Sequence, residues 1–341
     1  MENPLEKWIY AKTAGKDIKE YQFEKVIETL EYVGSRSKFY KKLYEGTDIS
    51  TIKSFTDFEK LPFTAASDLI NYGAHMICVP QHEIERIVTL YTSGTTGEPK
   101  RVYFTEADQE LTIDFFHHGM TCIINEKDNF MILLPYKKPG SVGDLLIRGL
   151  KRLGCGIYPY GLVEDDRHAG EFIVKNKITS LVGSPVQVLK LAELTKEYGL
   201  DIKLNSVLLS VEYIPDATVK RLENLWDCKV YEHYGMTEMC FGGGVYCEHL
   251  QGYHMREADL YFEIVSESGE VLPDGEYGEV VFTTLTRTGM PLVRYRTGDY
   301  GRFKTEYCAC SNYLKLMEKV KGRISNGVAA VEKEIQHEAK N

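Results

Sequence analysis

The feature that most constrains the fold is a regular alternation of short apolar runs with longer amphipathic stretches over residues 105–235. The two kinds of segment succeed one another, with strand-like runs at 130–134, 179–182, 206–209 and 229–231 and helical patterns near 142–153, 185–198 and 216–226. Strands that alternate with helices form mostly parallel sheets covered by helices. In such sheets ligands bind beyond the carboxyl ends of the strands. The pattern therefore predicts an α/β fold with a ligand site at that edge.

The flanking segments have different patterns. Apolar residues recur at three- and four-residue spacing over 17–33, which predicts a helix, and residues 87–91 and 102–104 have strand composition. After about residue 240, β-strand patterns predict a small β-barrel-like unit, with strands at 260–265, 278–283 and 292–296. We expect an N-terminal helical region (1–86), an α/β core (87–239), a β-rich subdomain (240–323) and a terminal stub (324–341).

Composition and charge exclude several classes of protein. The chain has 341 residues, 43% of them hydrophobic, and a formal net charge of −9. This is an ordinary globular composition, and the negative charge argues against nucleic acid as the main partner. The sequence opens without a signal-peptide pattern, and no apolar run approaches the roughly 20 residues that span a bilayer. The eight cysteines are then expected to be mostly buried thiols in a reducing cytoplasm, in a protein without a membrane partner.

A glycine- and hydroxyl-rich segment separates the strands predicted at 87–91 and 102–104. It consists of Thr92, Ser93, Gly94, Thr95, Thr96 and Gly97, and Lys100 follows it. Glycines let backbone N–H groups approach an anion, hydroxyls add donors and lysine adds charge, so the segment predicts a phosphate-binding loop. It is not the P-loop of the nucleotide triphosphatases, because its glycines are too close together and Pro99 precedes Lys100. The alternative is an ordinary surface hairpin of turn-forming residues.

Three motifs in this order resemble the core motifs of the adenylate-forming superfamily of acyl-CoA synthetases, adenylation domains and luciferases. They are the segment 92–100, Tyr234-Gly235-Met236-Thr237-Glu238 and Tyr295-Arg296-Thr297-Gly298-Asp299. Further similarity to the phenylacetate–CoA ligase branch extends to about Arg323. The resemblance implies the large N-terminal domain of that superfamily and an enzyme that activates a carboxylic acid, aryl or arylacetic, with ATP. The products would be an acyl-adenylate and pyrophosphate, and the acceptor CoA or a carrier-protein thiol.

The resemblance also implies roles for individual residues. The loop 92–97 and Lys100 would hold the β and γ phosphates of ATP, and Thr237 would hydrogen-bond the α phosphate. Glu238 would hold Mg²⁺, which prefers carboxylate and phosphate oxygens. Tyr234 would lie against the adenine, and Asp299 would accept the ribose hydroxyls. The other residues implied near the nucleotide are Glu212, Tyr213, Gly235, Met236, Arg302 and Arg323.

Two segments depart from the family pattern near the expected ligands. Residues 210–215 stand where the family often has Gly-Gly-Glu-Pro, and Val211 and Tyr213 add bulk there. Residues 137–139 replace the glycine- and aromatic-rich stretch that is usual in the phenylacetate branch. By their position at strand ends, the residues expected to line the acid pocket are Tyr136, Gly183, Ser184 and Pro185.

Two pairs of potential metal ligands occur in the β-rich region. Cys308 and Cys310 form a tight pair, and Cys247 and His254 are spaced as Cys-x6-His. Four sulfur and nitrogen ligands would suit a closed tetrahedral zinc site. Cys240 and His249 are substitute ligands, and the alternative is a set of buried free thiols with an exposed histidine.

Full-length members of the superfamily continue into a small C-terminal domain that carries a lysine for adenylation. No lysine after Arg323 sits in that lysine motif, so we expect this domain to be absent. A separate protein would then supply the lysine, or adenylation would be slow. Two other interpretations are adenylyl transfer to a different acceptor and a non-catalytic nucleotide-binding protein. Because relatives are often dimers, the resemblance also allows a homodimer.

Overall fold

The computed structural model describes residues 4–91, 99–311 and 313–324, and its centre is an eight-stranded sheet in the order β13-β9-β8-β7-β6-β5-β3-β4. The parallel strands follow the predicted alternation and are β3 (Asn129–Ile132), β4 (Gly156–Pro159), β5 (Ser180–Gly183), β6 (Ser206–Leu209) and β7 (Lys229–Tyr234). Antiparallel strands extend the sheet beyond β7, namely β8 (Gly244–Tyr246), β9 (Tyr253–Met255) and β13 (Leu316–Met317). The predicted α/β class is confirmed.

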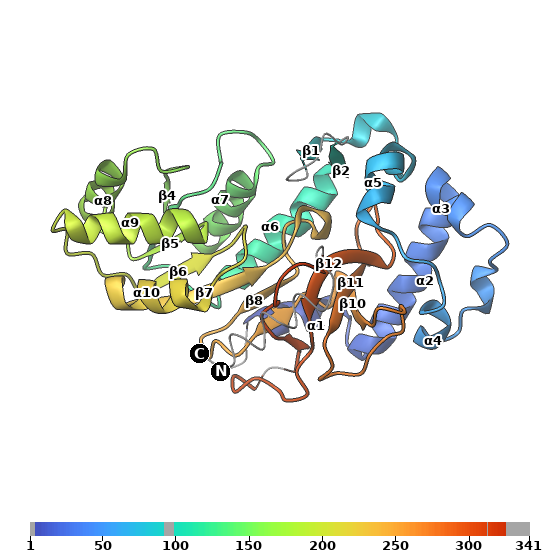
Figure 1. The fold of residues 1–341 in the computed structure, drawn as a ribbon. Coiled ribbons are helices and arrows are strands. Elements are labelled where there is room, and N and C mark those ends of the chain that lie inside the picture. Colours follow the sequence, from blue (N-terminus) through green and yellow to red (C-terminus); the bar gives the residue numbers. More distant parts are fainter. Residues whose placement is uncertain (1–3, 92–98, 312, 325–341) are drawn as a thin grey trace.

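Helices cover both faces of this sheet. They are α6 (Glu106–Met120), α7 (Val142–Leu153), α8 (Asp166–Lys175), α9 (Pro185–Glu197) and α10 (Asp216–Trp226). Because successive strand residues point to opposite faces, β3 sends Phe130 and Ile132 into a core shared with α6 and α7. Met131 joins a second core with α8, α9 and α10, which Figure 1 shows together at one end of the molecule. With both faces closed, the strand ends are the place left for a ligand site.

A second, three-stranded antiparallel sheet packs against the N-terminal helices. Its strands are β10 (Leu260–Val265), β11 (Gly278–Thr284) and β12 (Tyr295–Gly301). The helices are α1 (Pro4–Lys12), α2 (Ile18–Arg36), α3 (Lys38–Leu43), α4 (Phe55–Phe58) and α5 (Ala66–Tyr72). The carboxylate of Asp17 caps α2 by accepting from two N–H groups of its first turn. The apolar face of α2, including Val26 and Leu30, packs with Leu285 next to β11.

Shorter elements connect these layers. β1 (Arg86–Leu90) and β2 (Lys100–Phe104) form an antiparallel two-stranded sheet on either side of the glycine-rich segment. The short 3₁₀ helices are η1 (Ile49–Thr51), η2 (Gly73–His75), η3 (Gln81–Glu83) and η4 (Thr237–Met239). In the described part of the chain, every helix is too short or too polar to cross a bilayer.

The buried side chain of Arg294 joins the N-terminal region to the second sheet. Its guanidinium pairs with Glu263 at 2.8 Å and donates to the backbone carbonyls of Glu59 and Leu61. Both side chains of the ion pair are at most 1% exposed. Burial raises the pKa of Glu263, although the charge of Arg294 opposes this. Removal of one partner would therefore leave the other buried without compensation.

Some elements differ from the sequence-based expectations. The strand predicted at 292–296 begins only at Tyr295, because Arg294 has a φ of 47°, outside the extended region. The strands β8 and β9 have three residues each, too few to show an alternating pattern. The strands β10, β11 and β12 form an open three-stranded sheet where a barrel-like unit was expected, and β13 joins the large sheet. The domain boundary at 239/240 remains a prediction, and the large sheet continues across it.

We expect Arg294→Ala to lower the free energy of unfolding by about 3–5 kcal/mol, because Glu263 would stay buried without a counter-charge. The matched control is Arg221→Ala, since Arg221 and Glu193 are 55% and 43% exposed. That variant should lose less than about 1 kcal/mol. Urea unfolding followed by tryptophan fluorescence measures both variants. Equal losses would contradict a special role for the buried pair.

Candidate functional site

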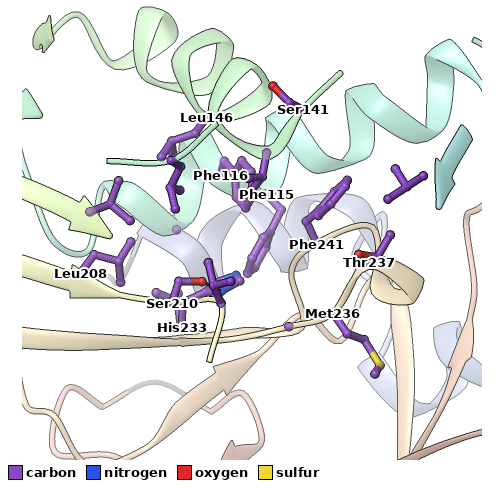
Figure 2. A pocket seen from close by; sticks show the side chains of 18 of the residues that line it. Phe115, Phe116, Ser141, Leu146, Leu208, Ser210, His233, Met236, Thr237 and Phe241 are labelled. Carbon is purple, nitrogen blue, oxygen red and sulfur yellow. Dashed lines mark hydrogen bonds between the residues drawn. The ribbon is translucent and has the colours of Figure 1, made fainter. Parts of the chain in front are cut away.

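Two cavities meet at the carboxyl ends of β6 and β7. The first, which we call the apolar cavity, has a volume of about 350 Å³ and lies between α6, α7 and the ends of β3, β5 and β6. The second, the polar cavity, has about 260 Å³ and is lined largely by polar and charged side chains. Val211, His233 and Gly235 line both cavities. Figure 2 shows the apolar cavity, with Phe115 and Phe116 reaching into it from α6.

The chain leaves β7 through a tight turn at Gly235. A Cβ atom there would lie 2.5 Å from the carbonyl oxygen of Phe241 and 2.9 Å from Cε1 of His233, so no side chain fits. The turn leads into η4, and Met236 and Thr237 line the apolar cavity. The glycine of this motif thus lets the end of a strand lie directly against the turn that follows it.

Glu238 is buried at the end of the β1–β2 hairpin. Its Oε1 atom forms a close ion pair with Nζ of Lys100, the first residue of β2, and accepts a hydrogen bond from the hydroxyl of Tyr295 at 3.1 Å. Burial and the neighbouring Glu238 carboxylate raise the pKa of Tyr295, which keeps this hydroxyl a donor. Lys100 and Glu238 therefore meet next to Thr237, at the edge of the apolar cavity.

The glycine-rich segment of the first motif lies outside the described residues. This applies to Thr92, Ser93, Gly94, Thr95, Thr96 and Gly97. Their described neighbours Leu90 and Lys100 stand opposite each other in the β1–β2 ladder. The described residue Lys100 contacts Glu238, and the phosphate-binding role of the segment stays a prediction.

Asp299 lies in the polar cavity with two of the predicted nucleotide residues. The hydroxyl of Tyr234 donates to its Oδ2 atom at 3.0 Å, and Nε of Arg323 lies 2.8 Å from Oδ1. Burial raises the pKa of Asp299, and the charge of Arg323 and the hydrogen bond from Tyr234 oppose this. Glu212 and Tyr213 line the same cavity.

Arg302 lies away from both cavities. Its guanidinium pairs with Glu318 at 2.8 Å and stands over the ring of Tyr277. All of these side chains are described, and the lining of the two cavities does not include Arg302. The structure thus gives Arg302 partners within the protein, and its role at the nucleotide stays a prediction.

A third carboxylate in the polar cavity, that of Glu232, has no counterpart in the sequence-based expectations. Glu232, in β7, pairs through Oε1 with Nζ of Lys319 at 2.8 Å, and the hydroxyl of Tyr253 donates to Oε2 at 3.1 Å. Burial raises the pKa of Glu232 even with Lys319 beside it. The signal in the sequence that could have identified Glu232 is the alternation of side chains along a strand, which places Glu232 on the same side of β7 as Tyr234. Its partner Lys319 is 87 residues away, so no local pattern predicts the pair.

The residues expected to form the acid pocket are not among those that line the apolar cavity. Tyr136, Gly183, Ser184 and Pro185 are all described, and none of them lines the apolar cavity. Val182 faces the cavity, so its neighbour Gly183 faces the opposite core, where a Cβ would lie 2.6 Å from a methyl of Val188. Ser184 and Pro185 instead begin α9. The wall is built from other apolar side chains, including Phe115, Phe116, Leu134, Val182, Leu208 and Phe241.

His233 separates the two cavities. Its Nδ1 atom lies 3.1 Å from the hydroxyl oxygen of Ser210, and its ring lies near Phe115 and Phe116. Burial lowers the pKa of His233 to about 4. The ring is therefore neutral at neutral pH, and the partition between the cavities carries no charge there.

The structure brings Cys247, His254, Cys308 and Cys310 together. Their potential ligand atoms all lie within 4.8 Å of one another, whereas Cys240 and His249 are not in the group. The Sγ atoms of Cys247 and Cys308 are 3.6 Å apart, as are Sγ of Cys310 and Nε2 of His254. Zinc bonds of about 2.3 Å to sulfur and 2.0–2.1 Å to nitrogen, in tetrahedral geometry, place such ligand atoms about 3.6–3.8 Å apart. The donor set and its spacing therefore fit zinc.

The fold and these cavities define an α/β domain with two ligand-sized cavities at the carboxyl ends of its parallel strands. Residues 34–286 match the sequence model of the family described as AMP-binding enzyme. The match covers well over half of the chain, so this protein belongs to the AMP-binding enzyme family.

Individual relatives show which members of the family the chain resembles. The chain is 29% identical over 314 residues to a phenylacetate-coenzyme A ligase of Thermus thermophilus, covering 89% of this chain and 69% of the relative. It is 29% identical over 302 residues to the same enzyme of Pseudomonas putida, covering 85% of this chain and 68% of the relative. A solved 2-hydroxyisobutyryl-CoA ligase with 2-HIB-AMP and CoA superimposes with a TM-score of 0.82 at 23% identity, covering 90% of this chain and 68% of that one. At this identity the likeness concerns the fold.

We expect Lys319→Met to give a variant whose stability deficit grows as the pH rises. Without the lysine, the pKa of buried Glu232 rises further above its unfolded-state value. A carboxyl with a raised folded-state pKa favours folding while protonated and opposes it once ionised. The free energy of unfolding should therefore fall relative to the parent by about 1–3 kcal/mol between pH of about 5 and 8.

Chemical denaturation over this pH range measures the deficit. The double variant Glu232→Gln/Lys319→Met is the control and should lose the pH dependence, because the titrating carboxyl is gone. A deficit of the single variant that is constant with pH would contradict the pairing.

Proposed function

We propose that this protein activates a carboxylic acid with an apolar or aryl body as its acyl-adenylate, releases pyrophosphate, and passes the acyl group to CoA. The observation that best supports this proposal is that an apolar and a polar cavity meet at Gly235, beside Lys100 and Glu238. Membership of the AMP-binding enzyme family supports the use of ATP. Similarity to phenylacetate-coenzyme A ligases supports an acid substrate and CoA as acceptor.

The first chemical step places an acid carboxylate at this junction. One of its oxygens attacks the α-phosphorus, a new O–P bond forms, and pyrophosphate leaves with the electron pair of the broken bond. Such a step needs neutralised phosphates and little water. Lys100 would supply positive charge, and the hydroxyl of Thr237 would donate a hydrogen bond to the α phosphate. Residues 92–97 lie outside the described residues and remain the predicted ligands of the β and γ phosphates. The sulfur of CoA then attacks the acyl carbon, its proton is lost to solvent, and AMP leaves.

The polar cavity would bind the nucleoside. Asp299, already fixed by Tyr234 and Arg323, accepts the ribose hydroxyls. The carboxylate of Glu232 has lone pairs beyond those used by its partners, and it would accept a hydrogen bond from the adenine amino group. Glu212 and Tyr213 complete this wall.

Glu238 is the proposed ligand of Mg²⁺. Both of its side-chain contacts use Oε1, and in the described part of the chain Oε2 carries none, which suits a hard cation shared with phosphate oxygens. Bound there, the ion would neutralise charge on the phosphates. Lys100 and Tyr295 would hold the carboxylate in place.

Magnesium-dependent exchange of pyrophosphate into ATP, followed by analysis for a CoA thioester, tests the proposal. Exchange that requires an added acid, with thioester formation, supports it. Transfer of the adenylyl group to another acceptor without a thioester would favour the second interpretation. Nucleotide binding without exchange for any acid would favour a non-catalytic protein. A carrier protein, or a separate protein equivalent to the C-terminal domain, is a further proposed partner to add, and a homodimer remains a prediction.

We expect Glu238→Gln to lower the exchange rate by about 10²-fold or more, because the neutral amide holds a cation at the phosphates poorly. The parent and Glu276→Gln, which removes an exposed carboxylate outside both cavities, should exchange at the same rate. Initial rates at saturating acid and ATP measure the effect. Unchanged exchange in Glu238→Gln would refute the metal-binding role.

We also propose that Cys247, His254, Cys308 and Cys310 hold a structural zinc ion. Four protein ligands close the coordination sphere, as in structural sites. The ion would tie the β8–β9 hairpin to residues 308–310, which precede β13 in the same sheet. The eight cysteines, all within the described residues, form no disulfide, which is consistent with the proposed cytoplasmic location.

We expect about one zinc ion per chain in protein purified without added metal, and little in Cys308→Ser, because three ligands hold zinc less tightly than four. Elemental analysis gives the stoichiometry, and a chelator should lower the melting temperature of the parent. Cys228→Ser is the control and should keep both its zinc and the chelator response. Clearly substoichiometric zinc in the parent would exclude the site.

A further inference from the structure

Arg86 is a charged residue in the otherwise mostly apolar cavity. Its side chain forms no hydrogen bond or ion pair with any described residue, and its Nε atom is buried without a partner. The hydroxyl of Ser141 lines the same cavity and is also buried without a partner. Buried donors without acceptors are costly to a folded protein. The wall thus presents two donor groups, one of them on a cation, that no residue in the described part of the chain satisfies.

The strand β1 sets the place of Arg86 in the cavity. Arg86, Val88 and Leu90 alternate along the strand, and all three line the cavity. Leu90 stands opposite Lys100, whereas Arg86 stands opposite Phe104. Arg86 and Leu90 are four residue steps apart, which is about 13 Å at 3.3 Å per residue. Arg86 therefore marks the end of the cavity remote from Lys100 and Glu238.

Gly140 makes room for the side chain of Arg86. A Cβ atom at Gly140 would lie 3.3 Å from Cδ of Arg86 and 2.6 Å from Oε1 of Gln109, so the arginine stem packs directly against the backbone. Gly140 also has a φ of 70°, which favours glycine. The next residue is Ser141, so the two unsatisfied donors belong to one packed corner.

We propose that the acid activated here carries a second anionic group, which Arg86 binds at this remote corner with a hydrogen bond from Ser141. The proposal rests on the proposed function of the cavity. A carboxylate matches a guanidinium in bidentate geometry, and the contact is stronger away from water. Between the two ends, Val88, Leu90 and Phe115 offer apolar contact. The substrate class is thus a dicarboxylic acid with an aryl or short aliphatic spacer.

Matched acids in the pyrophosphate exchange assay test this proposal, because that assay needs no CoA. The probes are 4-carboxyphenylacetate against 4-methylphenylacetate, and pimelate against heptanoate. We expect the parent to show at least a tenfold higher kcat/KM for the diacid of a pair. Arg86→Gln should remove at least tenfold of that preference, mainly through KM, and change the monoacid less than twofold. Arg86→Lys should be intermediate. Arg101→Gln, on the exposed face of β2, should match the parent.

Other outcomes separate this proposal from the proposed function. Equal use of both acids by the parent, or an equal loss for both acids in Arg86→Gln, overturns the role of Arg86 and leaves acid activation standing. A change confined to the KM for CoA in the complete reaction overturns it as well.

If no acid supports exchange, acid activation fails, and calorimetric titration of the same acids in the presence of AMP decides the role of Arg86. Tighter binding of the diacid to the parent than to Arg86→Gln supports the proposal, and equal binding overturns it.

Discussion

The site depends on one close approach of the backbone, at Gly235. There the end of β7 lies against the turn that follows, at a distance that excludes even a methyl group. The strand delivers His233 and Tyr234 to the two cavities, and the turn sends Thr237 and Glu238 to the β1–β2 hairpin. Because these contacts share one junction, the two cavities meet at the same residues. The helix-covered parallel sheet holds β7 in place and leaves its carboxyl end open.

Much of the fold could be predicted because burial imposes a period on the sequence. β6, α7 and α10 have the bounds that their apolar patterns indicate, since each buries one face or both. The β-rich part was harder to predict. The residues around Arg294 have strand-like composition, but Arg294 itself has a positive φ. Its guanidinium is held by Glu263 and by backbone carbonyls that are distant in the chain. No local pattern contains that information.

The candidate site was likewise predictable from the sequence only in part. Motif residues such as Asp299 and Glu238 could be selected from the sequence, and the structure places them in or beside the cavities. The residues of the cavity wall could not be selected from the sequence, because the alternation of side chains along β5 turns Val182 toward the cavity and Gly183 away from it. Pairs such as Glu232 and Lys319 depend on contacts across the sheet, which spacing along the chain does not show.

Val211 stands in the wall that the two cavities share, and its φ of 84° is rare for a β-branched residue. Such a conformation costs on the order of 1–3 kcal/mol and persists only where the surroundings impose it. Any ligand that lets Val211 relax gains part of this free energy. If the ligand in the other cavity also binds the strained and relaxed conformations differently, linkage makes the effect of each ligand on the affinity of the other equal. Under that condition, the conformation of this one residue couples the affinities of the two cavities for their ligands.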